Sequence, residues 1–97
     1  MATYIMLHRY TQKGIEKIKE SPTRLEAVKK AFKALGAELK QFYLVAGQYD
    51  IVTISEAPDA ETMAKCALGV ASKGTVTTET LRAFTEDEYR KIIGALP

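Results

Sequence analysis

The chain has 97 residues and a formal net charge of +2, and 46% of its residues are hydrophobic. This length predicts one domain, residues 1–97, with enough apolar side chains for one core. Acidic and basic residues are interspersed, which argues against the basic face or run that nucleic-acid binding requires. The densest basic cluster, Lys29, Lys30 and Lys33, is typical of a solvated helix face.

Two side chains that occur once each limit the chemistry further. Cys66 is the one cysteine, so an internal disulfide is impossible, and His8 is the one histidine, which leaves few options for a metal site. No acidic cluster has the spacing of metal ligands, and no glycine-rich phosphate loop occurs. No charged leader precedes an apolar run, and no apolar stretch reaches membrane-spanning length. We therefore expect a cytoplasmic protein without a metal or cofactor.

The first third of the chain predicts a strand and then a helix. Residues 3–10 are rich in aromatic and aliphatic side chains, which favours a central strand. A short helical turn is expected over residues 12–20, and Ser21 followed by Pro22 is typical of an N-cap and first helical position. The main helix should run to Leu35 and end at Gly36. Its buried stripe is predicted to consist of Leu25, Val28, Phe32 and Leu35.

The remaining two thirds predict three more strands and two helices. Strands are expected over residues 38–45, 48–55 and 75–84, with a hairpin turn at Ala46 and Gly47. Asp59 is a plausible cap for a helix that Gly74 closes. Its expected apolar face comprises Ala60, Met63, Ala64, Ala67 and Ala71. Thr85 and Glu88 have capping-box spacing and should begin a terminal helix. The apolar side of that helix carries Tyr89, Ile92, Ile93 and Leu96.

This order of elements predicts a ferredoxin-like βαββαβ fold of the α+β class, with an antiparallel sheet and an added C-terminal helix. Right-handed crossovers place both main helices on one face of the sheet. On the helix-free face we expect Tyr4, Met6, His8 and Tyr10, together with Tyr49, Ile51 and Thr53. A bulge that inverted the assignment would exchange the two faces. An apolar face of this kind marks an interface, so we expect two sheets to pair around a two-fold axis.

The stretch from Gly47 through Tyr49 and Asp50 to Ile51 and Val52 resembles the GYD-domain family. The opening residues 4–7 and the segment 74–84 also look like that family. The resemblance implies a homodimer or larger homo-oligomer whose sheets close into a dimeric α/β barrel. It implies no biochemical activity, because the family has none that is agreed.

A more distant likeness runs to the ligand-binding domains of leucine-responsive regulators, which bind small metabolites between subunits. These domains have a similar strand pair, a Gly-x-Tyr-Asp-like turn and a later threonine-containing strand. No helix-turn-helix segment precedes the first strand here, so this analogy predicts no DNA-binding role. The likeness is an association through fold, and it suggests a ligand without identifying one.

Five residues are candidates for contact with a small molecule inside the barrel: Tyr4, His8, Tyr10, Tyr49 and Thr53. His8 is the side chain whose ordinary pKa lies nearest neutrality, so it can act as a base or donor, or as a neutral hydrogen-bonded interface residue. Tyr49 can line a cavity and bond to a ligand, or simply pack.

Other distinctive residues favour structural roles. Asp50 is expected to accept backbone N–H bonds and hold the turn, and Gly47 is expected to supply positive φ there. Cys66 is interpreted as a small buried thiol rather than a nucleophile. The strand over residues 75–84 contains Thr75, Thr77, Thr78 and Thr80, which fit strand propensity better than phosphate binding.

Three functions remain open from the sequence. The first is a small-molecule-binding or regulatory homo-oligomer with no membrane or nucleic-acid partner. The second is a cofactor-independent enzyme of the barrel class, similar to a monooxygenase or isomerase, with His8 as the base. The third is an assembly module without a ligand.

Overall fold

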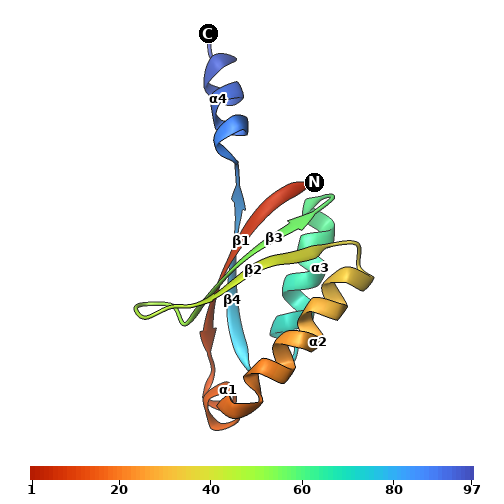
Figure 1. The fold of residues 1–97 in the computed structure, drawn as a ribbon, viewed down its shortest axis with the longest axis vertical. Helices are drawn as coiled ribbons and strands as arrows, with labels where there is room; N and C mark the ends of the chain where they lie inside the picture. The colour runs from red at the N-terminus through yellow and green to blue at the C-terminus, as the bar shows by residue number, and fades with distance from the viewer.

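A computed structural model describes all residues, 1–97, and contains one four-stranded antiparallel sheet with strand order β2-β3-β1-β4. The strands are β1 (Ala2–Tyr10), β2 (Glu38–Leu44), β3 (Ile51–Ala57) and β4 (Val76–Ala83). The helices are α1 (Gln12–Glu16), α2 (Ser21–Ala34), α3 (Ala60–Ala71) and α4 (Glu86–Gly94), with a 3₁₀ turn at Ile18–Glu20. The predicted order of elements is confirmed, and α2 and α3 lie on one side of the sheet (Figure 1).

Side-chain caps set the start of three of the four α-helices, α1, α3 and α4. The Asp59 carboxylate accepts the backbone N–H of Thr62 at 2.8 Å, as an N-cap does at the start of α3. Thr85 and Glu88 form the predicted capping box at α4, with reciprocal hydrogen bonds of 2.9 and 3.2 Å. The prediction of Ser21 as an N-cap is wrong, because the preceding 3₁₀ turn runs directly into α2 and Ser21 is already helical.

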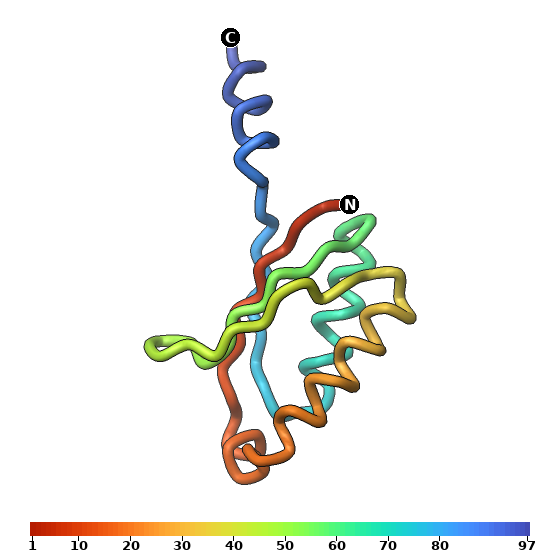
Figure 2. Tube along the Cα trace, in the orientation of Figure 1, coloured from red at the N-terminus to blue at the C-terminus, as the bar shows by residue number.

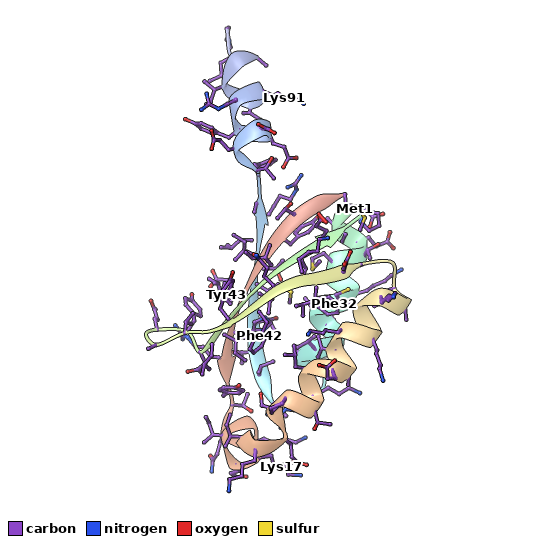
Figure 3. The ribbon with its side chains drawn as sticks, viewed as in Figure 1. Met1, Lys17, Phe32, Phe42, Tyr43 and Lys91 are labelled. Atoms are coloured by element: carbon purple, nitrogen blue, oxygen red, sulfur yellow. The ribbon has the colours of Figure 1, made fainter.

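The core lies between the sheet and the two long helices. Phe32 of α2 points from its helix toward the sheet (Figure 3). It is buried in one cluster with Met63 and Cys66 of α3 and with Met6 and Tyr4 of β1. Leu35, predicted as part of the buried stripe of α2, is 44% exposed, since it lies after the last helical turn.

The predicted assignment of sheet faces is wrong for most of its residues. The side chains that pack under the helices are Tyr4, Met6, His8, Tyr10, Ile51 and Thr53, which we expected on the helix-free face. Pairing between β1 and β3 is regular along its whole length, so no bulge accounts for the inversion. The one register shift lies in β2, between Leu39 and Gln41.

The helix-free face is nevertheless apolar, and its apolar side chains are arranged in two rows across the strands. In one row Ile54, Ile5 and Leu81 are cross-strand neighbours. In the next row Tyr43, Val52 and Leu7 are neighbours, and the row ends at Glu79 of β4. These six side chains, Ile5, Leu7, Tyr43, Val52, Ile54 and Leu81, are called the aliphatic face below. Each is half-buried or exposed, and Tyr43 reaches 49% exposure.

Two segments extend beyond the body of the sheet. The β2–β3 loop spans residues 45–50 and is longer than the predicted two-residue hairpin. The tube in Figure 2 shows this loop and the C-terminal helix α4 projecting in different directions, which gives a molecule of 52 × 31 × 17 Å. None of the helices combines the length and the hydropathy that crossing a membrane requires.

Candidate functional site

The His8 side chain lies on the helix-covered side of the sheet, beneath α2. Its Nε2 atom is 3.1 Å from Thr53 Oγ1, and only 6% of the residue is exposed. This is the one hydrogen bond that the ring makes, so Nδ1 has no protein partner. Burial lowers the pKa of His8 to about 4, because an imidazolium would lose its hydration there. The ring is therefore neutral near pH 7.

A cavity of about 70 Å³ adjoins this ring between α2 and the sheet. Most of its wall is apolar, with Phe32 and Val28 from α2 and Phe42 from β2. The polar part of the wall comprises His8, Tyr10, Ser21, Arg24, Thr53 and Thr75. The Tyr10 and Ser21 hydroxyl oxygens are 3.0 Å apart and join β1 to the start of α2. A small, mainly apolar molecule with one polar group fits this composition.

The five predicted ligand-contact residues do not form one site. His8, Tyr10 and Thr53 line the cavity, and Tyr4 lies in the core nearer the other end of β1. Tyr49 lies on the opposite side of the sheet, because its hydroxyl meets Glu79, the cross-strand neighbour of Leu7 on the helix-free face. The prediction that these residues share the helix-free face fails, and their ligand-binding roles stay predictions.

Tyr49 belongs to a polar recess of about 160 Å³ beside the aliphatic face. Its hydroxyl donates to Glu79 Oε2 at 2.6 Å, and this hydrogen bond raises the pKa of Tyr49. The Arg9 guanidinium lies 4.8 Å from the centre of the Tyr49 ring, a cation–π distance. Arg9 Nε also donates to the carbonyl oxygen of Gln48 at 2.8 Å. The recess thus presents a cation, a phenol and a carboxylate together.

Asp50 connects the β2–β3 loop to the end of β1. Its carboxylate accepts the backbone N–H of Tyr10 at 2.9 Å, and its own N–H donates to the carbonyl oxygen of His8 at 2.9 Å. Gly47, with φ of +149°, lies at the turn of the loop. The Asp50 carboxylate thus fixes the base of the loop to β1, and this contact holds Tyr49 beside Arg9.

Three residues of these sites were missed by sequence reasoning: Arg9, Glu79 and Arg24. Arg9 and Glu79 meet Tyr49 only through the pairing of β1 with β4, and residues 9 and 79 are distant in sequence. An alternating pattern gives no sign of such a contact. Arg24 is one of several cations on α2, and no sequence signal separates it from the others.

Cys66 is buried in α3, where loss of hydration raises the pKa of its thiol. This environment disfavours the thiolate that nucleophilic chemistry needs. No group of three or more His, Cys, Asp or Glu side chains is placed to hold a metal ion.

Strand order β2-β3-β1-β4, with two crossover helices on one side, defines the ferredoxin-like class of α+β domains. The GYD domain model matches residues 4–93, and the chain belongs to the GYD-domain family.

Two similar proteins match most of the chain. A protein of Thermus thermophilus, named glutamine synthetase and cystathionine beta-lyase binding protein, is 38% identical over 87% of this chain and 90% of its own length. The solved structure of TTHA0845, also from Thermus thermophilus, is 29% identical, with a TM-score of 0.57, and covers 88% of this chain and 95% of that one.

A feast or famine regulatory protein from M. tuberculosis, solved with L-methionine, has a TM-score of 0.64 at 17% identity. The match covers 90% of this chain, which spans about half of the regulator's length, 54%. At this identity the likeness concerns the fold alone.

Proposed function

We propose that this protein is a regulatory binding protein that works as a homo-oligomer and docks on metabolic enzymes. The observation that carries the proposal is the aliphatic face, a continuous apolar surface on the side of the sheet without helices. The name of the Thermus thermophilus relative, a binding protein for two enzymes, supports the second half of the proposal.

The aliphatic face supplies the drive for pairing. A half-exposed Ile or Leu side chain that becomes covered contributes about 1 kcal/mol, roughly half the value for complete burial. The six side chains are contiguous in two register rows, so a second sheet can cover all of them at once. Pairing through a two-fold axis lets one surface serve both subunits. The Tyr49 recess borders this face, so pairing would place it between subunits.

Self-association is tested by reversing the character of one side chain. Leu81 is 43% exposed in the isolated subunit, so Leu81→Lys leaves the core intact while it places a charge in the pair. We expect sedimentation velocity to show a paired wild type and a variant of half its mass. Leu68→Lys, at a 70% exposed position on α3, is the matched control and should stay paired. A monomeric wild type at high concentration would overturn the pairing.

Enzyme binding is tested separately. Purified wild-type protein, immobilised, is presented with glutamine synthetase and with cystathionine beta-lyase from the same source. We expect saturable binding of at least one of them, as the name of the relative suggests. Absence of binding to both, with the oligomer intact, would refute the docking half and leave the pairing half standing.

A second function, binding of a small metabolite, is favoured by the cavity beside His8. The neutral imidazole and Thr53 offer directional hydrogen bonds within an apolar wall. A metabolite panel in a thermal-shift assay should raise the melting temperature of the wild type. The shift should be lost in Val28→Phe, which fills the cavity. No shift at saturation with any compound would count against this function.

The enzymatic alternative with His8 as the base has weaker support. A pKa of about 4 makes the buried imidazole a poor proton acceptor at neutral pH. The ring is better suited to hold a ligand by a hydrogen bond than to abstract a proton from it.

A further inference from the structure

The C-terminal helix α4 has no packing partner within its own subunit. It contains no buried residue, and it projects away from the sheet beyond the end of β4 (Figure 1). A helix of nine residues is marginal in water without tertiary contacts, even with a capping box. Helix α4 therefore requires a surface to cover its apolar side.

Side chains of opposite kinds separate along α4. The first turn is acidic, with Glu86, Asp87 and Glu88. The later part has a stripe at helical spacing, which Leu96 continues just beyond the end of the helix: Tyr89, Ile92, Ile93 and Leu96, each between 46% and 62% exposed. Within its own subunit Glu86 pairs with Arg90 and Glu88 pairs with Arg82, so Asp87 is the acidic side chain of the first turn without an ion pair. The helix presents this acidic first turn and, farther along, one apolar stripe to any partner.

A groove of complementary character runs between α2 and α3. It has a volume of about 430 Å³, and its wall includes the small residues Ala27, Ala31 and Gly69 together with Leu35. Small side chains let another helix approach closely. Arg24, at the start of α2, and Lys73, just after α3, lie at one end of the groove, while Leu35 lies at the other. Lys65, midway along α3, also lines the groove, but it is paired with Glu61 at 3.8 Å. Arg24 and Lys73, which have no carboxylate partner, are therefore the cations left for a partner at one end of the groove, and Leu35 lies at the other.

We propose that α4 of one copy lies in the α2–α3 groove of a second copy, with its acidic first turn toward Arg24 and Lys73 and its apolar stripe toward Ala31 and Leu35. This contact uses neither the aliphatic face nor the Tyr49 recess. It joins copies head to tail, so it adds a ring or a larger assembly to any sheet-paired dimer.

The basic end of the groove and the acidic first turn of α4 can meet when α4 comes from a second copy, but not when α4 folds back onto its own subunit. Figure 1 shows α4 following the end of β4, while the start of α2 and the end of α3 lie toward the opposite end of the sheet. Arg24 and Lys73 belong to that opposite end of the groove, and Leu35 follows the far end of α2. If α4 folded back onto its own groove, it would enter beside Leu35 and place its acidic turn there. A helix from another molecule can enter with the opposite direction and match both ends.

Disulfide trapping in the full-length chain tests the direction directly. In a Cys66→Ala background, Ala31→Cys combined with Leu96→Cys should give disulfide-linked dimers and higher multimers under mild oxidation. Ala31→Cys with Asp87→Cys, the matched control, should give few linked chains. A cross-link within one chain for the Asp87→Cys pair would show α4 on its own body and overturn the proposal. So would equal yields from both pairs.

Charge exchange supplies an independent readout. Lys73→Glu should reduce the mass of the assembly in light scattering to that of the next smaller species, and Glu86→Lys in the same chain should restore it. Lys29→Glu, on α2 outside the groove, should leave the mass unchanged. Leu81→Lys disrupts only the contact between sheets, and Lys73→Glu disrupts only the α4 contact. The two variants should therefore have different masses, which separates a failure of sheet pairing from a failure of the α4 contact. If Ile92→Asp leaves the wild-type mass intact, α4 does not join copies, and the proposal is wrong.

Discussion

Replacing His8 by glutamine should flatten the acid side of the stability curve. His8 is 6% exposed, and the only hydrogen bond of its imidazole ring is to Thr53. Glutamine is of similar size and also bonds to a hydroxyl, but it does not titrate. The variant therefore removes the proton-binding step and keeps a polar side chain at this position.

The sign and size of the effect follow from the pKa difference. The folded-state pKa of about 4 lies below the ordinary value of 6.5, so between these values the unfolded chain binds a proton that the folded chain excludes. The contribution of His8 to the free energy of unfolding is fully present above pH 6.5 and is lost as the pH falls toward 4. At about 1.4 kcal/mol per pH unit, the difference amounts to roughly 3 kcal/mol.

Urea unfolding followed by circular dichroism, at a fixed protein concentration, measures this contribution. The free energy of unfolding of the wild type should fall by about 3 kcal/mol more than that of His8→Gln between pH 7 and pH 4. The carboxylates titrate in both proteins, so their contribution to the pH dependence cancels when the wild type is compared with His8→Gln. Parallel pH profiles for the two proteins would refute the reasoning, because His8 would then titrate alike in the folded and unfolded states.

Three further substitutions test the packing, each by the urea midpoint and the free energy of unfolding. Gly14→Ala should destabilise by about 1–3 kcal/mol, because an added Cβ would lie 2.1 Å from the carbonyl oxygen of Thr75; an unchanged midpoint would contradict this close approach. Ser55→Ala should stabilise by about 1 kcal/mol, since its buried hydroxyl has no hydrogen-bond partner; a loss of stability would reveal a bond that the structure lacks. Asp50→Ala should cost about 2 kcal/mol by removing the acceptor of the Tyr10 N–H; a cost near zero would mean that the loop does not hold β1.

The order of the elements was predictable because local signals mark their ends. Asp59 and the Thr85–Glu88 pair have side chains that cap helices wherever the backbone allows it, so their positions in the sequence suffice. The β2–β3 loop was predicted too short. Its length depends on the bonds of Asp50 to the backbone of β1, a contact with a distant strand that a local turn signal does not contain.

The faces of the sheet were not predictable from alternation. Strand β1 has apolar side chains on both sides, so its pattern does not show which side meets the helices. We expected the tyrosines and His8 on the helix-free side, but Tyr4, Tyr10 and His8 lie on the helix-covered side, and Ile5 and Leu7 take the helix-free side. Phe32 and Met63 of the helix layer belong to one buried cluster with Met6, which places this side of β1 toward the helices. The expectation that two sheets pair through their helix-free faces remains a proposal, because the residues that do occupy that face are also apolar.

The position of β1 has a consequence for synthesis on the ribosome. This strand leaves the exit tunnel before the other three strands, yet it occupies the interior of the sheet between β3 and β4. Its partners begin at Ile51 and Val76, so neither of its edges can be paired until translation has passed Ile51. The nascent strand thus carries two unpaired edges and two apolar sides for much of its elongation. We expect it to be the segment that ribosome-associated chaperones must shield.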